Sequence, residues 1–278
     1  MNPWIKTLRA DIFKHVGLIL IVLCTYYPLF FVLVNSLKDN AQFQANIFNV
    51  ALPLHFDNYG AAWPSIDGFM LNSVFVATAS ILGTLICGSL AAYVLARFPF
   101  RGREAIFMLY VGLLLIPFIL TLIPLYLEMK SLHLIDSWWA LILPYVAGGQ
   151  VLTVFILRAF FAGLPEEIFE AGRIDGASEW QLFSRIALPL SLAPLGAIAI
   201  VTAINAWGDF LWPTIVLPTA SKYTMSAGVA FFTSQFGLVS QTGQVFAVYM
   251  MSTIPVVVLV ILTMRTYVSG LTSGALKV

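Results

Sequence analysis

The residue in this sequence that is most suggestive of chemistry is Asp209, a carboxylate near the end of an otherwise apolar run. Asn205 and Thr202 precede it by four and seven residues, a spacing that places all three on one face of a helix. Together they could line a polar path for a solute. Polar packing between helices explains Asn205 and Thr202 equally well, and Asp209 could serve only to anchor a helix end close to water.

Other chemistry has little support in the sequence. Trp207 could stack on a sugar ring, although tryptophan is also common where a membrane helix meets water. No nucleophile, acid and base occur together, so we expect neither a catalytic residue nor an enzyme. The two cysteines lie in apolar runs and are expected to be small buried hydrophobes, and the three histidines lack metal-ligand spacing. We therefore expect no metal and no cofactor on this chain at Cys24, Cys87, His15, His55 or His133.

The composition indicates which solvent surrounds these residues. Hydrophobic residues make up 60% of the 278 residues and charged residues only 10%, against about 25% charged in a soluble domain. So few charges cannot cover a water-exposed surface, and six apolar runs are long enough to cross a bilayer. The sequence therefore predicts an all-α polytopic membrane protein that forms one transmembrane domain, with six transmembrane helices over residues 16–37, 70–96, 105–127, 138–157, 190–212 and 245–264.

The positive charges predict the orientation of these helices. Eleven Lys and Arg residues fall on one side of the six spans and three on the other, so the positive-inside rule places both termini in the cytoplasm. The first run is too long for the apolar region of a signal peptide and is expected to be a retained anchor. The expected location is the plasma (inner) membrane of a bacterium or archaeon, and the chain is expected to contact the lipid bilayer and no nucleic acid.

The connection 158–189, on the cytoplasmic side, has the clearest local pattern. Pro165 suits the first position of a helix, and Glu166, Glu167 and Glu170 follow in the turns where the helix dipole favours carboxylates. Glu170 and Arg173 are spaced to pair. Ile168, Phe169 and Gly172 are expected to form a partly apolar exposed surface.

A second short helix should follow a sharp turn. Asp175 and Gly176 favour the turn, Ser178 and Gln181 form a capping-box pair, and Pro189 is expected to end the helix at the membrane. Two amphipathic helices joined by such a bend would suit docking into a groove of a cytosolic protein. A solvated loop with ordinary interfacial helices is the alternative.

The same residues carry a resemblance. The stretch EAGRIDGASEWQLFSRIALP contains Glu170, Ala171, Gly172 and, after three residues, Gly176, followed by nine residues and a segment ending at Pro189. It resembles the E-A-A, three residues, G, nine residues, I-x-L-P signature of permeases in binding-protein-dependent ATP-binding-cassette (ABC) importers. Gly172 replaces the usual second alanine. Residues 205–213 and 270–277 resemble the carbohydrate branch of that family, and specifically its maltose-type second permease, although Gly208 stands where asparagine is common.

The resemblance implies a type I ABC importer permease that forms half of a translocation pathway. It implies three kinds of partner: a second homologous permease, in a heterodimer; two copies of a nucleotide-binding ATPase subunit that hold ATP and Mg²⁺; and an extracytoplasmic solute-binding protein. Consistently, the chain lacks a G-x-x-x-x-G-K-[ST] phosphate loop. Residues 158–189 would be the cytoplasmic coupling segment, with coupling to the ATPase assigned to Glu170, Ala171, Gly172, Asp175, Gly176 and Pro189.

Two alternatives remain open from the sequence. Six spans would also suit a secondary transporter or channel that is not driven by ATP, although such a protein has no need of a docking bend. The extracytoplasmic connections 38–69 and 213–244 could contact a soluble partner or could merely tie helices together.

Overall fold

The structure is a computed structural model that describes the backbone of residues 3–275 and the side chains of 14–235, 237, 241–261 and 263. The terminal stretch 270–277 and Lys277 therefore lie outside the described side chains. Residues 3–275 are all-α, with no β-strand among them. The long helices are α1 (Pro3–Ser36), α3 (Asp57–Arg97), α6 (Trp139–Ala162), α10 (Leu192–Gly208), α12 (Met225–Ser240) and α13 (Thr242–Ala275). The shorter helices are α2 (Asn40–Ala45), α4 (Arg103–Leu113), α5 (Phe118–Ser131), α7 (Glu166–Ile174), α8 (Glu179–Leu182), α9 (Leu188–Leu190) and α11 (Leu211–Val216).

Four described helices are long and apolar enough to cross a membrane unaided, within α1, α3, α6 and α13, and two bent pairs bring the number to six if each pair is one span. The expected helix 105–127 is therefore corrected: it consists of α4 and α5, bent by 103°. Pro117 explains the break, because it has extended backbone angles (φ −62°, ψ 130°) and cannot donate a backbone hydrogen bond.

The expected helix 190–212 is also not continuous. The helical stretch 179–190, which contains a π-helical turn at Phe183–Ala187, meets α10 at 75° beside Ser191. Pro189 lies inside that stretch, so it does not end the helix as expected. α10 then ends at Gly208, and α11 starts three residues later.

The chain divides into two units, and residues 1–66 with 231–254 form the first. The connection between α1 and α3 in this unit is held by several buried or partly buried hydrogen bonds. Lys38, only 1% exposed, donates to the Oδ1 atom of Asn35 at 3.0 Å and to the carbonyl of Asn46 at 2.9 Å. Asn58 donates to the carbonyls of Ser36 and Lys38, both at 2.9 Å. Burial lowers the pKa of Lys38.

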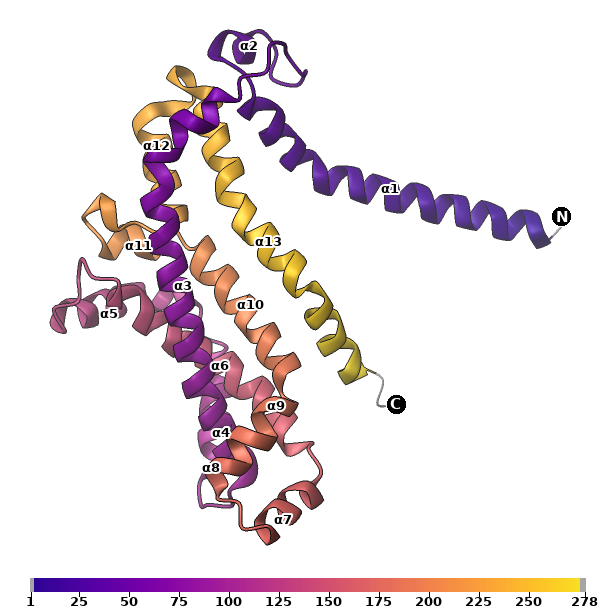
Figure 1. The fold of residues 1–278 in the computed structure, drawn as a ribbon, viewed down its shortest axis with the longest axis vertical. Helices are drawn as coiled ribbons and strands as arrows, with labels where there is room; N and C mark the ends of the chain where they lie inside the picture. Colours follow the sequence, from indigo (N-terminus) through magenta and orange to yellow (C-terminus); the bar gives the residue numbers. More distant parts are fainter. Residues whose placement is uncertain (1–2, 276–278) are drawn as a thin grey trace. The chain divides into compact units, whose positions relative to one another are not determined.

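Residues 67–230 with 255–278 form the second unit, which holds both candidate sites. In Figure 1, α3, α6 and α10 run side by side, with α7 and α8 at one end and α5 and α11 towards the other. α3 and α6 approach closely because glycine faces larger side chains: a Cβ on Gly83 would lie 2.6 Å from Val146, and one on Gly149 would lie 2.8 Å from Thr84.

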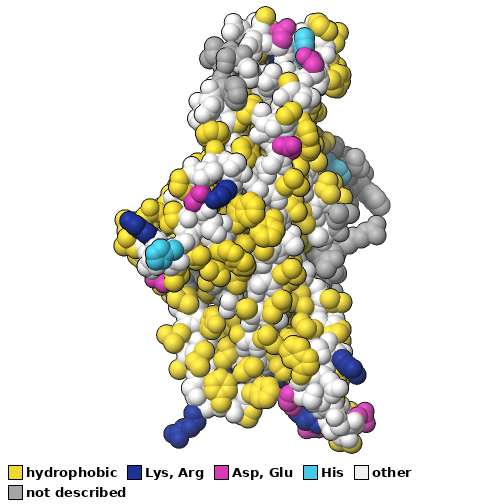
Figure 2. All heavy atoms as spheres, turned by 60° about the vertical axis from the view of Figure 1, so that its left-hand side comes forward, with side chains coloured by type: hydrophobic (Ala, Val, Ile, Leu, Met, Phe, Trp, Pro, Cys, Tyr) yellow, Lys and Arg dark blue, Asp and Glu magenta, His cyan; other side chains and the backbone are white. Residues whose placement is uncertain are grey.

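The surface of the second unit fits a lipid environment. Figure 2 shows hydrophobic side chains over its visible face and charged side chains at its lower end, where α7 lies. Cys24 and Cys87 correct another expectation, because both are exposed rather than buried. Their helices, α1 and α3, carry many exposed apolar side chains, as helices that face lipid do.

Candidate functional site

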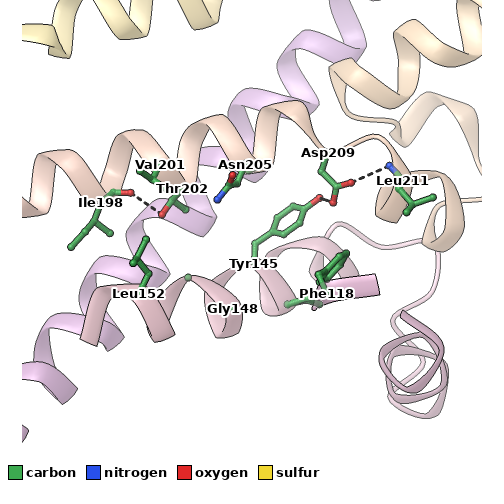
Figure 3. A pocket seen from close by; sticks show the side chains of 13 residues that line it. Phe118, Tyr145, Gly148, Leu152, Ile198, Val201, Thr202, Asn205, Asp209 and Leu211 are labelled. Atoms are coloured by element: carbon green, nitrogen blue, oxygen red, sulfur yellow. Dashed lines mark hydrogen bonds between the residues drawn. The ribbon is translucent and has the colours of Figure 1, made fainter. Parts of the chain in front are cut away.

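A cavity of about 460 Å³ lies in the second unit, and most of its lining comes from α6 and α10. Its volume is within the range of about 300–1,000 Å³ that is typical of small-molecule sites. Figure 3 shows Tyr145 and Leu152 on α6 facing Thr202 and Asn205 on α10, with Asp209 just past the end of α10. The cavity thus brings together three of the four residues expected to form a path: Thr202, Asn205 and Asp209.

Asp209 has a structural role at the break that separates α10 from α11. Its backbone is extended (φ −72°, ψ 117°), and its Oδ1 atom accepts from the backbone N–H groups of Leu211 at 3.0 Å and Trp212 at 3.2 Å. Its Oδ2 atom accepts from the hydroxyl of Tyr145 at 2.8 Å. The carboxylate therefore caps the start of α11 and joins it to α6 while lining the cavity.

Thr202 and Asn205, the two other polar residues on this face of α10, differ in which hydrogen-bonding groups remain unused. The hydroxyl of Thr202, 8% exposed, donates to the carbonyl of Ile198 at 2.9 Å, which satisfies its hydrogen within its own helix. Asn205 is exposed, and its side-chain amide makes no hydrogen bond within the part of the chain that the structure describes. Asn205 thus offers both a donor and an acceptor to the cavity.

Trp207 does not line this cavity. It lines a separate groove with Val74 and Thr78 of α3 and Ala203 of α10. The sequence reasoning also missed Tyr145, the partner of Asp209. A tyrosine inside an apolar run was the available signal, because a buried tyrosine hydroxyl usually needs a hydrogen-bond partner.

The second candidate site is the coupling segment (residues 158–189). Pro165 lies at the N-cap of α7, one position before the helix. Gly176 has φ +81°, a left-handed conformation that suits glycine at the predicted turn. The predicted capping box at the start of α8 is present, with the Ser178 side chain accepting from the Gln181 N–H and the Gln181 side chain accepting from the Ser178 N–H.

An ion-pair network locks the two arms of this bend. Arg173 donates to Glu166 at 2.9 Å and to Glu179 at 3.0 Å, so it joins the start of α7 to the start of α8. The expected Glu170–Arg173 pair is wrong, because the guanidinium is committed to these two carboxylates. Hydrogen bonds from Arg173 to Glu166 and Glu179 raise the pKa of Arg173 above its ordinary value.

The inner side of the bend is fastened to the C-terminal end of α3. Phe169 is fully buried, which corrects the expectation that it is part of an exposed surface. The guanidinium of Arg97 lies 4.0 Å from the centre of the Phe169 ring, pairs with Glu166, and donates to the carbonyl of Leu164 at 2.8 Å. The hydroxyl of Tyr93 donates to Glu179 at 3.4 Å.

The remaining residues assigned to coupling divide between the two sides of the bend. Gly172 faces inward, since a Cβ there would lie 2.5 Å from a terminal methyl of Leu182. Glu170, Ala171, Asp175, Gly176 and Pro189 are exposed. Ile174, beside them, is 86% exposed. An apolar side chain so exposed among polar neighbours is a feature of surfaces that bind another protein.

The fold and these two sites define a multi-pass membrane permease subunit, located in the plasma membrane. Residues 84–269 match the family described as "Binding-protein-dependent transport system inner membrane component". The chain belongs to this family, and it is a permease subunit of an ABC importer.

Individual relatives cover nearly the whole chain. It is 30% identical over 271 residues to the diacetylchitobiose uptake system permease protein NgcG of Streptomyces coelicolor, covering 97% of this chain and 90% of that protein. It is 35% identical over 270 residues to the sn-glycerol-3-phosphate transport system permease protein UgpE of Yersinia pestis, covering 94% and 95%. A chain in a crystal structure of a bacterial ABC transporter involved in the import of the acidic polysaccharide alginate has the same fold, with a TM-score of 0.82, 22% identity and coverage of 96% and 98%.

Proposed function

We propose that this chain forms half of the translocation pathway of an ATP-driven importer for a carbohydrate or a related polyol, with both termini in the cytoplasm. The observation that carries the proposal is the coupling segment: its exposed signature residues, including Glu170 and Gly176, lie on a bend whose two arms are joined by Arg173. A bend held in this way can transmit a push without unfolding. Similarity to permeases named for diacetylchitobiose and arabinooligosaccharides supports the solute class.

The partners follow from the family and from the chain itself. A second homologous permease would complete the pathway, and an extracytoplasmic solute-binding protein would deliver the solute. Two copies of an ATPase subunit would bind ATP and Mg²⁺, because this sequence has no phosphate-binding loop. We therefore assign the chain no catalytic role of its own.

The structure suggests a route by which ATPase movement could reach the membrane helices. A displacement of α7 would act on α6 and α8 through the chain, and on α3 through Phe169, Arg97 and Tyr93. Because α6 and α10 line the cavity, the same displacement could change access to it. This is a change between two packed arrangements and requires no chemistry on this chain.

Glu170→Lys and Gly176→Pro test the coupling role. Both variants should insert into the membrane and should lose ATP-driven uptake and co-purification with the ATPase subunit. Glu167→Lys is the matched control, because Glu167 is exposed on the same helix and lies outside the signature. Normal uptake and unchanged co-purification in both test variants would overturn the proposal and favour a transporter that does not use ATP.

The charge of the solute is a separate question, because relatives do not agree on it. Diacetylchitobiose in one relative's name is uncharged, whereas sn-glycerol-3-phosphate in another is an anion. Solute charge in this chain must therefore be inferred from its own cavity.

A further inference from the structure

The described lining of the cavity between α6 and α10 carries a negative charge and no positive charge. Its thirteen described lining residues include one carboxylate, Asp209, and no Lys, Arg or His. At the coupling segment, by contrast, carboxylates are balanced by positive charges, because Arg173 and the neighbouring Arg97 of α3 both pair with carboxylates. No such positive charge lies among the described residues of the cavity lining to balance a negative solute.

Hydrogen-bond donors are also scarce in the cavity. The hydroxyl hydrogen of Tyr145 is used by Asp209, and that of Thr202 is used by the carbonyl of Ile198. Both oxygens can still accept, and the Asp209 carboxylate retains accepting capacity beyond its three bonds. Among the described polar side chains of the lining, only the Asn205 amide has free N–H groups, so acceptors exceed donors.

We infer that this cavity admits solutes that donate hydrogen bonds, either uncharged polyhydroxyl compounds or sugars bearing a protonated amine, and rejects anions such as phosphorylated polyols and uronates. An anion here would lie beside Asp209 with a single amide to replace its water shell, and both effects oppose entry. Hydroxyl and ammonium groups, by contrast, would meet the acceptors that the cavity presents. The inference rests on the proposed function in one respect, that the solute passes through this cavity.

Charged thiol reagents measure this selectivity without knowledge of the natural solute. The background is the full-length chain in its assembled transporter with Cys24→Ser and Cys87→Ser, since both native thiols are exposed. Leu152→Cys places one thiol in the cavity lining. Two methanethiosulfonate reagents are compared, one with a cationic trimethylammonium-ethyl group and one with an anionic sulfonatoethyl group. The measured quantity is the rate of modification by the cationic reagent divided by the rate by the anionic reagent. This rate ratio is then divided by the same ratio for free cysteine.

The cationic reagent should react faster at Leu152→Cys, and adding Asp209→Asn should lower the rate ratio by roughly fivefold or more. Asp136→Asn is the matched control, because that carboxylate is not part of the cavity lining, and it should leave the ratio unchanged. Val201→Cys is a second reporter in case Leu152→Cys fails to assemble. A ratio near that of free cysteine, or one unaffected by Asp209→Asn at either reporter, would overturn the inference.

A solute experiment separates this inference from the proposed function. Glucosamine, glucose, glucuronate and sn-glycerol 3-phosphate are tested at high concentration for slowing the modification of Leu152→Cys. The first two should protect the thiol and the two anions should not. Equal protection by the anions would contradict the selectivity even if Glu170→Lys abolishes ATP-driven uptake. Normal uptake and unchanged co-purification in Glu170→Lys and Gly176→Pro, with the selectivity intact, would contradict only the proposed function.

Discussion

The two candidate sites in the second unit are built in opposite ways. In the coupling segment, Arg173 is paired, as is Arg97 of α3 beside it, and a core rich in aromatic side chains packs beneath the bend. In the cavity, the Asn205 amide is free within the described chain and the space is about 460 Å³. The first region is filled and its ion pairs are made within the protein, although the buried Nε atom of Arg97 has no hydrogen-bond partner among the described residues. The second region is open, and it leaves the Asn205 amide free.

This difference matches two mechanical tasks. A segment that transmits displacement must keep its shape, so its polar groups are best satisfied within the protein. A pathway must let a solute enter and leave, so its polar groups must exchange partners between solute and water. The contrast predicts that substitutions in the coupling segment will affect stability and coupling, whereas conservative substitutions in the cavity will chiefly affect selectivity.

The largest effect is expected from Phe169→Ala. Phe169 is fully buried in the core beneath the bend, and removing a buried phenylalanine costs about 3–5 kcal/mol. Arg97 would also lose the ring beneath its guanidinium. Thermal unfolding of the purified transporter should show a clear destabilisation. Ile168→Ala, at a position that is 42% exposed on the same helix, should have a much smaller effect, and equal effects would mean that the core is not specifically packed.

Arg97→Met should have the next largest effect. The Arg97 side chain is 7% exposed, and losing its hydrogen bonds to Glu166 and the Leu164 carbonyl should cost about 1.5–3 kcal/mol. Because Arg97 joins α3 to α7, solute imported per ATP hydrolysed should also fall, a change that simple destabilisation does not produce. Arg101→Met, on the exposed loop after α3, is the control. An unchanged ratio with reduced stability would limit Arg97 to a structural role.

The coupling segment is also the region that sequence reasoning described best. Its turn and cap depend on neighbouring residues: Gly176 has the left-handed φ expected of the turn, and Ser178 and Gln181 form the capping box. The prediction failed for Arg173, whose partner Glu179 lies across the bend. Adjacent spacing on one helix suggested Glu170 instead, because sequence alone does not show how a bend folds back.

The cavity was less predictable for the same physical reason. Helical spacing correctly placed Thr202 and Asn205 on one face of α10, whereas Asp209 lines the same cavity from just past the end of that helix. Tyr145 comes from another helix, 64 positions from Asp209. Apolar periodicity also could not show that α10 stops at Gly208, since residues on both sides of the break are apolar. Pro117 did carry a local signal for the break between α4 and α5, but proline is tolerated in many membrane helices.

Gly176→Ala tests the turn, with a smaller effect. A side chain in the left-handed region costs roughly 1–2 kcal/mol, although nothing crowds a Cβ at this position. Transport should weaken and the bend should become more accessible to protease. Gly208→Ala is a matched control in the cavity region, because a Cβ there also meets nothing and its φ is not left-handed. If Gly176→Ala and Gly208→Ala reduced transport equally, the left-handed backbone at Gly176 would not distinguish the coupling segment from the cavity region.

The smallest effect is expected at the opposite end of the second unit, where Asp136 and Lys222 form a partly exposed ion pair at 2.7 Å. The hydrogen bond from Lys222, assisted by Thr219, lowers the pKa of Asp136 below its ordinary value. A depressed carboxyl pKa gives stability that is present above the ordinary value of about 3.9 and is lost as the pH falls through the folded-state pKa. Asp136→Asn should therefore lower the Tm slightly at pH 7 and make no difference in strong acid.

Salt dependence allows the Asp136–Lys222 pair to be compared directly with the contacts of Arg97. Asp67→Asn is the control, because Asp67 is exposed and has no basic partner among the described residues. Exposed pairs contribute little because water and salt screen them, whereas the Arg97 contacts are largely shielded. Raising the salt concentration should therefore shrink the Asp136→Asn effect and leave the Arg97→Met effect nearly unchanged. Equal salt sensitivity in the two variants would show that the coupling network is as solvated as this outer pair and would contradict its role as a rigid transmitter.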